Sequence, residues 1–277
     1  MIPIVVPVPT RDLSFQPLPG ATGLSTWTRR GAVTTFATLD VSEQPDRVVV
    51  TLDRPAQRNA INAEMIGELH KVCARLEAEP KLLLLTGRGD HFAGGADISE
   101  LRARGRDDAL AGINRNLFDR IGRLPLPTVA AVSGFALGGG AELSYACDIR
   151  IATSTARFGN PEPGLGIMAA AGASYRLPQL VGTSVAKQVL LGGHVLDADA
   201  ALRTGLVLEV VDPGTHVEAA HRLLDRIARF APLALRLTKT IVDVPGAHPF
   251  ADDIAQAVLF ETDDKRDRMT AFLERKT

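Results

Sequence analysis

Apolar and β-branched residues occur in two short runs, at 36–41 and 47–52, which are separated by the turn-forming residues 43–46. This pattern predicts a β-hairpin. The apolar positions that follow recur every three or four residues, which predicts a helix over 63–79 with Asn62 as its N-cap. The face of this helix that we expect in the core consists of Met65, Ile66, Leu69, Val72, Cys73 and Leu76.

Uninterrupted apolar runs then alternate with helical patterns. We expect buried strands at 81–86, 128–133 and 148–152, and a helix over 107–123. Strands that alternate with helices predict an α/β architecture with parallel strands. From about residue 184 onward nearly every segment has the pattern of an amphipathic helix, so we expect a helical C-terminal part.

The N-terminal segment carries no clear element. Residues 1–35 mix Pro, Gly, Thr and Ser without periodicity, so we expect an extension that lies on the surface or is partly disordered. The first ten residues contain three prolines and no basic segment, which argues against a signal peptide. The longest uncharged run, residues 124–141, is interrupted by Pro125, Pro127 and several glycines, so it does not predict a membrane span.

Composition narrows the classes of function. The 277 residues carry 31 Lys+Arg and 32 Asp+Glu, a balance that gives no electrostatic reason to expect nucleic acid or an anionic membrane as partner. The two cysteines, Cys73 and Cys147, lie far apart, so we expect no disulfide framework and a cytoplasmic location. The six histidines show no metal-ligand spacing, so we expect no metal site.

The segment HFAGGADISEL, residues 91–101, contains the first candidate site. Asp97 followed by Glu100 is a capping-box pattern, which predicts that a helix begins here. One interpretation is a capped helix after a turn and no more. The other is a ligand site, because Gly94 and Gly95 allow a ligand close to the backbone and the free N–H groups of a helix start attract negative charge.

The segment AAVSGFALGGGAEL, residues 130–143, places three successive glycines between a predicted strand and a helix. Their cost in chain entropy is explained if a backbone amide must face a ligand. Neither G-x-G-x-x-G nor a Walker lysine is present, so the segment does not predict a nucleotide site. Glu142, in the first turn of the helix, either complements the helix dipole or serves as a buried acid or base.

The segment FGNPEPGLG, residues 158–166, carries Glu162 between two prolines. A solvent-facing loop glutamate is the simpler interpretation. The neighbouring residues are apolar or small, however, and this scarcity of other charges favours a functional carboxylate.

Together these segments resemble the enoyl-CoA hydratase/isomerase (crotonase) family. The motifs LDRPAQRNAIN, FAGGADISEL, AVSGFALGGGAELSYACDIRIA and FGNPEPGLG match in order and spacing. The resemblance continues through RLPQLVG and DADAALRTGLV to FETDDKRDRMTAFLERK, and so covers residues 36–277. It implies a crotonase-like (ClpP/crotonase) α/β fold, a spiral of repeated ββα units with a helical C-terminal trimerisation region. The expected division is an N-terminal extension at 1–35, a core with the acyl-CoA site at 36–200 and a helical region at 201–277.

The resemblance also implies roles for individual residues. The backbone N–H groups of Ala96, in GGAD, and Gly139, the middle glycine of GGG, correspond to an oxyanion hole for the thioester carbonyl. Glu142 and Glu162 correspond to the two glutamates that hold a water against the Cα=Cβ bond in family hydratases. Isomerase relatives generally keep only one acid at these places, so the presence of both favours a hydratase.

Coenzyme A contacts are implied as well, with the CoA belonging to the substrate and no separate cofactor. The matching positions near CoA are Arg58, Ala60, Asp97, Ile98 and Ser99, with Arg58 facing either a phosphate or solvent. Phe272 and Arg275 match places that touch the CoA of a neighbouring subunit. The resemblance therefore implies a homo-oligomer, a homotrimer or a dimer of trimers.

One segment departs from the family pattern P-G-x-G-G-T-Q-R-L. This chain has AAAGASYRL at 169–177, with Tyr175 in place of a smaller polar side chain. The change in backbone freedom beside the acyl pocket leaves the acyl-chain preference open.

These observations lead to one hypothesis and two alternatives. The hypothesis is an enoyl-CoA hydratase that adds water to trans-2-enoyl-CoA, with Glu162 as the proton donor to the α-carbon and Glu142 as the group that orients and activates water. The first alternative is another reaction on an acyl-CoA enolate, such as isomerisation, dehydration of an unusual acyl-CoA or C–C cleavage, because fold and oxyanion hole do not distinguish these. The second is an acyl-CoA-binding subunit with little catalysis.

Overall fold

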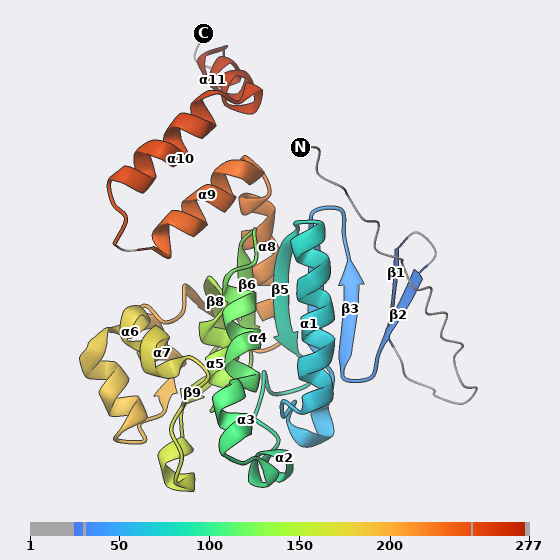
Figure 1. Ribbon diagram of the computed structural model, residues 1–277, viewed down its shortest axis with the longest axis vertical. Helices are drawn as coiled ribbons and strands as arrows, with labels where there is room; N and C mark the ends of the chain where they lie inside the picture. The colour runs from blue at the N-terminus through green and yellow to red at the C-terminus, as the bar shows by residue number, and fades with distance from the viewer. Residues whose placement is uncertain (1–24, 30–31, 245, 275–277) are drawn as a thin grey trace, which may run out of the picture.

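A six-stranded sheet forms the centre of the computed structural model, which describes residues 25–29, 32–244 and 246–274 (Figure 1). The strand order is β11-β8-β6-β5-β4-β3, and every neighbouring pair is parallel except β3 with β4. The strands are β3 (Leu39–Glu43), β4 (Arg47–Leu52), β5 (Leu82–Gly87), β6 (Thr128–Val132), β8 (Ile149–Thr153) and β11 (Glu209–Val211).

Helices cover both faces of this sheet, which explains why its central strands are continuously apolar. Leu83 and Leu85 of β5 point into the core that contains α1 (Ala63–Ala78) and α4 (Ile113–Gly122). Leu82 and Leu84 point to the opposite face, where they pack with α8 (His216–Ile227). The alternation of side chains along one strand thus builds two apolar layers.

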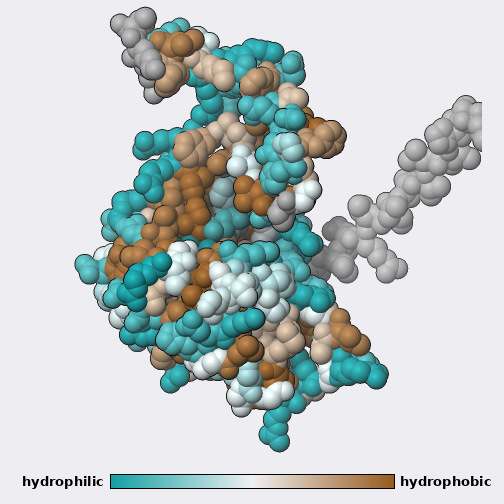
Figure 2. Space-filling model, turned by 90° about the vertical axis from the view of Figure 1, so that its left-hand side faces the viewer, coloured by the Kyte–Doolittle hydropathy of each residue, from teal (hydrophilic) through white to brown (hydrophobic). Residues whose placement is uncertain are grey.

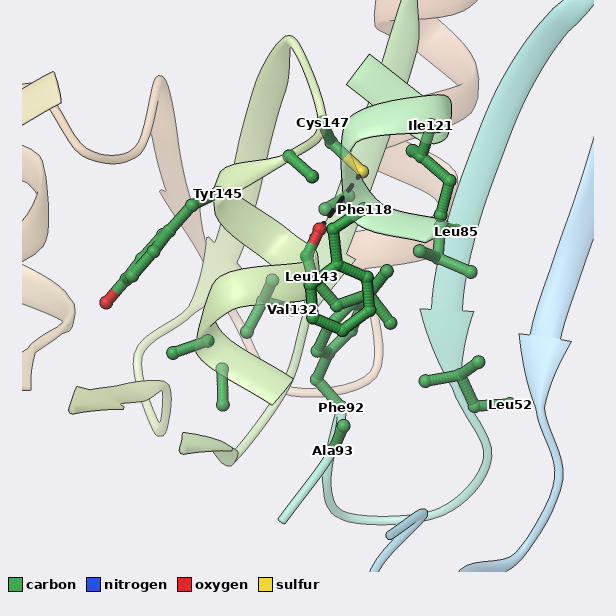
Figure 3. Packing of buried hydrophobic residues seen from close by; sticks show 14 of the residues in the cluster. Leu52, Leu85, Phe92, Ala93, Phe118, Ile121, Val132, Leu143, Tyr145 and Cys147 are labelled. Carbon is green, nitrogen blue, oxygen red and sulfur yellow. Dashed lines mark hydrogen bonds between the residues drawn. The ribbon is translucent and has the colours of Figure 1, made fainter. Parts of the chain in front are cut away.

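A smaller sheet brings the candidate loops to one end of the main sheet. Its strands are β7 (Phe135–Leu137), β9 (Arg157–Gly159) and β10 (Leu196–Asp197), in the order β10-β9-β7. The helix α5 (Gly139–Tyr145) follows β7 directly, and all of its residues are buried. Figure 3 shows Phe118 and Leu143 packed together in the core, whereas Tyr145 points away from them.

Several predicted elements are confirmed. The hairpin is β3–β4, and helix α1 begins where Asn62 Oδ1 accepts a hydrogen bond of 3.0 Å from the Met65 N–H. The three predicted buried strands are β5, β6 and β8. The helix predicted over 107–123 is observed as two helices, α3 (Arg106–Ala111) and α4, because Gly112 adopts a left-handed conformation with φ of 62°.

The sequence pattern missed the hairpin β1–β2 and the short strands β7, β9, β10 and β11. Within the predicted extension, β1 (Ser25–Arg29) and β2 (Ala32–Phe36) form an antiparallel hairpin beside β3. These two strands are therefore ordered, in contrast to the expected partial disorder. After residue 184, two strands interrupt the predicted helices. Strand β10 pairs antiparallel with β9, and β11 joins the main sheet parallel to β8. The predicted domain boundaries stay predictions, and the signal-peptide question concerns residues outside the described part of the chain.

A buried glutamate joins the hairpin to the core. The Glu68 carboxylate on α1 accepts hydrogen bonds from the N–H groups of Ala37 and Thr38, at 2.6 and 3.0 Å, and from the Thr38 hydroxyl at 2.5 Å. The adjacent Phe36 is 1% exposed. The chain between β2 and β3 is therefore held against α1 by both apolar and charge-assisted contacts.

The remaining helices lie at the edges of the body. They are α2 (Ile98–Ala103), α6 (Ala173–Leu190), α7 (Ala198–Arg203), α9 (Pro232–Val242), α10 (Phe250–Phe260) and α11 (Asp263–Glu274). A cleft of about 1070 Å³ separates α9 from α4, α5 and α6. Figure 2 shows apolar side chains in the hollow between the body and these C-terminal helices. Among the described residues, no helix is both long and apolar enough to span a membrane.

Candidate active site

Backbone hydrogen bonds hold the three candidate loops together. The Ala93 carbonyl accepts from the Leu137 N–H at 3.1 Å, which joins the GGAD loop to the GGG loop. The Gly138 N–H donates to the Gly159 carbonyl at 2.8 Å, which joins the GGG loop to the loop of Glu162. Segments that are about 70 residues apart in sequence therefore form one rigid site.

Two backbone N–H groups, those of Ala96 and Gly139, lie side by side. A Cβ atom built on Gly139 would be 3.4 Å from the Ala96 nitrogen. Neither N–H donates a hydrogen bond to another group in the described part of the chain. On either side of Ala96, it is the Gly95 carbonyl and the Asp97 N–H that bond to Ile61. The structure thus brings the two predicted oxyanion donors together, and both are free to bind a ligand oxygen.

A side chain would be unfavourable at each glycine of the GGG motif, for a different reason at each position. Gly138 has a φ of 51°, which disfavours any side chain, and its added Cβ would lie 3.1 Å from Glu162 Oε1. Gly139 leaves space in front of the Ala96 N–H. At Gly140 an added Cβ would lie 2.2 Å from the Ala93 carbonyl oxygen, so only glycine lets α5 approach the GGAD loop.

Glu142 lies on α5 and is 3% exposed. Its Oε1 accepts hydrogen bonds from the N–H groups of Ala171 and Ala173, at 2.8 and 3.0 Å. Its Oε2 accepts none from the described residues. One oxygen therefore fixes the carboxylate at the start of α6, and the other remains able to contact a water or substrate.

Glu162 begins the short 3₁₀ helix η2 (Glu162–Leu165) and is 8% exposed. Its Oε2 is buried and has no hydrogen-bond partner in the described part of the chain. The Asn160 Nδ2 atom is unpartnered in the same way, while its Oδ1 accepts a long bond of 3.4 Å from the Tyr145 hydroxyl. Two orphaned polar atoms in one loop indicate a place for a water or a ligand.

Burial controls the charge of both carboxyls. It raises the pKa of Glu142 to about 7, with the charge of Glu162 adding to the increase and the two backbone N–H groups and Arg176 opposing it. Burial also raises the pKa of Glu162. The pair therefore retains protons at higher pH than isolated carboxyls do, which suits a site that must both take and give a proton.

The loop before α1 runs beside the GGAD loop. The Arg58 carbonyl accepts from the Gly94 N–H at 2.8 Å, and the Arg58 side chain is exposed, with its guanidinium 5.9 Å from the Phe135 ring centre. The carbonyl of Ala60 accepts a hydrogen bond of 2.5 Å from Arg54. Two of the predicted CoA positions thus line this edge of the site.

The start of α2 holds the other predicted CoA positions. Asp97 caps the helix, and its carboxylate accepts from the Ser99 hydroxyl at 2.6 Å and pairs with Arg54 at 3.2 Å. Ile98 is 60% exposed. The predicted capping box does not form, because the Glu100 carboxylate accepts from the Ala63 N–H at the start of α1 instead.

Two predicted CoA residues are not brought to the site within one chain. Phe272 lies on α11, which Figure 1 places at the opposite end of the molecule from α2. Arg275 is outside the described residues. Their predicted contact with a neighbouring subunit's CoA stays a prediction.

Sequence reasoning missed the residues that support the site. Asn59 is fully buried with φ of 55°, and its amide donates to the carbonyls of Arg88 and His91, at 3.0 and 2.7 Å. An asparagine in a turn could have indicated Asn59, since Asn tolerates the left-handed backbone conformation. The N–H donors to Glu142 had no signal, because any residue carries a backbone N–H.

The part of the chain that the structure describes holds no group of three His, Cys, Asp or Glu side chains that could ligate a metal ion. The 1070 Å³ cleft is distinct from the carboxyl pair. Its wall includes Tyr145, Tyr175 and Arg176 but neither Glu142 nor Glu162.

Comparison with known proteins agrees with this geometry. Residues 44–277 match the enoyl-CoA hydratase/isomerase family. The short-chain-enoyl-CoA hydratase of Clostridium acetobutylicum is 41% identical over 241 residues, which are 82% of this chain and 91% of the relative. The crotonyl-CoA hydratase of Syntrophomonas wolfei is 36% identical and covers 87% of this chain and 96% of the relative.

A solved structure of an enoyl-CoA hydratase from Bacillus anthracis superimposes with a TM-score of 0.82 at 31% identity. The superposition covers 86% of this chain and 97% of that one. Sequence and structure therefore both place this chain in the enoyl-CoA hydratase/isomerase family.

Proposed function

We propose that the chain is an enoyl-CoA hydratase, a hydro-lyase that adds water to trans-2-enoyl-CoA to give 3-hydroxyacyl-CoA. The observation that carries the proposal is the pair of buried carboxyls, Glu142 and Glu162, beside the two free N–H groups of Ala96 and Gly139. The names of the relatives from Clostridium acetobutylicum and Syntrophomonas wolfei support the same reaction.

The geometry supports the following steps. The N–H groups of Ala96 and Gly139 bind the thioester oxygen and stabilise the negative charge that it gains as the enolate forms. The Glu142 carboxylate takes a proton from water, and the water oxygen bonds to Cβ. The carboxylic acid of Glu162 gives its proton to Cα as the enolate collapses. The family resemblance implies that both groups act on the same face of the double bond, which makes the addition syn. Exchange of one proton with solvent then restores both glutamates, and the net change is the addition of one water.

The two carboxyls differ in their hydrogen-bond donors, and the assignment of base and acid follows the family resemblance. Two backbone N–H groups bind Glu142 Oε1, and such bonds favour the ionised form that a base requires. No hydrogen bond reaches Glu162 Oε2 within the described residues, and burial raises the pKa of Glu162 against the opposing effects of its own backbone N–H and the Asn160 side chain. The CoA would lie along Arg58, Ala60, Asp97, Ile98 and Ser99.

A kinetic assay tests the proposal. The protein is mixed with crotonyl-CoA and longer trans-2-enoyl-CoAs, the loss of the enoyl-thioester absorbance is followed, and chromatography identifies 3-hydroxyacyl-CoA. Crotonyl-CoA comes first because one relative is named for it. Rapid formation of the 3-hydroxy product supports the proposal. Turnover to another product, or acyl-CoA binding without turnover, contradicts it and favours a different enolate reaction or a binding role.

The pH dependence of hydration follows from Glu142. Its pKa is raised to about 7, and only the ionised form accepts a proton from water. We therefore expect kcat/KM for crotonyl-CoA to rise as the pH increases through about 7. This rising part of the pH profile, the acid limb, reports the titration of the coupled carboxyl pair in the free enzyme. Initial rates between pH 5 and 9 measure this. In Glu142→Gln the residual activity should lose that limb, and an unchanged limb there would contradict the assignment.

We also propose the trimeric assembly of the family, alone or as a dimer of trimers. Phe250, Ile254 and Val258 are 73, 51 and 49% exposed and recur every four residues along α10. An apolar helix face of this kind indicates an interface. Light scattering should give three or six times the 29.5 kDa of one chain. Phe250→Asp should lower this mass and Gln256→Glu, on another face of α10, should not. A monomer for the unsubstituted protein would refute the assembly.

A further inference from the structure

Three side chains form a closed polar cluster behind Glu142. Asp119 Oδ1, on α4, accepts from the Tyr175 hydroxyl at 2.5 Å and from Arg176 Nη2 at 2.6 Å. Arg176 Nη1 donates to the Tyr175 oxygen at 3.0 Å. The guanidinium also lies 4.8 Å from the Tyr175 ring centre. The side chains of Arg176 and Asp119 are 15% and 24% exposed, and the cluster lies in the wall of the 1070 Å³ cleft.

This cluster rests on the turn that holds Glu142. The Arg176 N–H donates to the Gly172 carbonyl at 2.8 Å, and a Cβ on Gly172 would lie 2.2 Å from Arg176 Nη1. The guanidinium therefore packs directly on Gly172. On either side of that glycine, the N–H groups of Ala171 and Ala173 donate to Glu142 Oε1.

We propose that Arg176, held by Asp119 and Tyr175, is a positioning residue for Glu142. It fixes the turn at Gly172, so that the two adjacent N–H groups bind one oxygen of Glu142 and leave the other for water. The inference rests on the proposed hydratase function, in which Glu142 is the base.

Charge gives Arg176 a second effect on the same group. The charged or titratable side chains that act on Glu142 are Glu162 from η2, Arg176 from α6 and Tyr145 from α5 itself. Of these only Arg176 is cationic, and it lowers the pKa of Glu142 against the effects of burial and Glu162. Asp119 offsets part of this cationic charge because it pairs with Arg176.

Two substitutions separate positioning from a simple packing role. Arg176→Met removes the cation, so the acid limb of kcat/KM for crotonyl-CoA should move up by about one pH unit, and activity at pH 7 should fall about fivefold. Asp119→Asn keeps an acceptor for Tyr175 and Arg176 but removes the opposing charge, so the limb should move to lower pH. If the contacts between α4 and α6 served stability alone, the acid limb would stay in place in both variants.

Further variants make the test decisive. Arg176→Lys should restore the position of the limb but not the full rate, because lysine lacks the planar fork that contacts both partners. Arg120→Met, which breaks the ion pair between Arg120 of the same helix α4 and Glu77 of α1, is the matched control and should leave the limb in place. If Arg176→Met does not fold, Asp119→Asn and Tyr175→Phe decide the question.

The outcomes distinguish this inference from the proposed function. Opposite shifts in Arg176→Met and Asp119→Asn support it. A limb that stays in place in both variants, yet disappears in Glu142→Gln, overturns the role of Arg176 and leaves the hydratase intact. Absence of hydration by the unsubstituted protein, or a limb that persists in Glu142→Gln, overturns the proposed function itself.

Discussion

Replacement of Glu162 by Gln is expected to lower kcat/KM for enoyl-CoA hydration by about 10²–10⁴-fold, the usual contribution of a general acid. Gln has nearly the same size but no proton that it can give to the α-carbon. The Glu162 carboxyl is 8% exposed and burial raises its pKa, so the substitution removes a buried group that can give a proton. Stopped-flow loss of the thioester absorbance measures the effect.

The fold should survive this substitution, because Glu162 Oε2 has no partner to lose among the described residues. Urea unfolding and acyl-CoA binding should therefore remain close to those of the unsubstituted protein. Glu209→Gln, at an exposed position on β11, is the control and should keep full activity. Activity of Glu162→Gln within about threefold of the original would remove Glu162 from the mechanism.

Gly140→Ala should cost activity through the backbone. The new Cβ would lie 2.2 Å from the Ala93 carbonyl oxygen and 2.7 Å from the Ala93 Cβ, and neither backbone segment can give way easily. Helix α5 must therefore move away from the GGAD loop and carry the Gly139 N–H and Glu142 with it. Since loss of one oxyanion donor alone lowers kcat by about 10²–10³-fold, we expect a decrease at least that large in steady-state kcat.

The same substitution at an unconstrained glycine is the control. Gly67 lies in the middle of α1, and a Cβ there would meet nothing within 4 Å. Gly67→Ala should raise the free energy of unfolding by about 0.5–1 kcal/mol and leave kcat unchanged. If Gly140→Ala does not fold, Gly138→Ala tests the same loop, since its Cβ would lie 3.1 Å from Glu162 Oε1. Full kcat in a folded Gly140→Ala protein would contradict the oxyanion assignment.

Local sequence signals predicted those elements in which neighbouring residues cooperate. Alternation and apolar runs located β3, β4, β5, β6 and β8, and helical spacing with the Asn62 cap located α1. The sequence failed at β11, which is three residues long and becomes a strand only because β8 offers it a parallel edge. The hairpin β1–β2 was missed for a related reason, because its residues show no periodicity of their own.

The same division holds for the candidate site. The resemblance of the motifs to those of the enoyl-CoA hydratase/isomerase family pointed to Glu142, Glu162, Ala96 and Gly139, since residue type and glycine runs are properties of the chain itself. Only the tertiary structure placed the N–H groups of Ala171 and Ala173 on Glu142, because a backbone N–H leaves no trace in sequence.

The contact between Asp119 and Arg176 likewise depends on the fold, because the two residues are separated by 57 positions and only the fold brings these side chains of α4 and α6 together. By itself the sequence determined the α/β class, the family resemblance and the identity of the acidic groups. The structure decided their burial, and hence the pKa of about 7 for Glu142. The physical reason is that a carboxyl's proton affinity depends on the solvent, donors and charges around it, which only packing brings together.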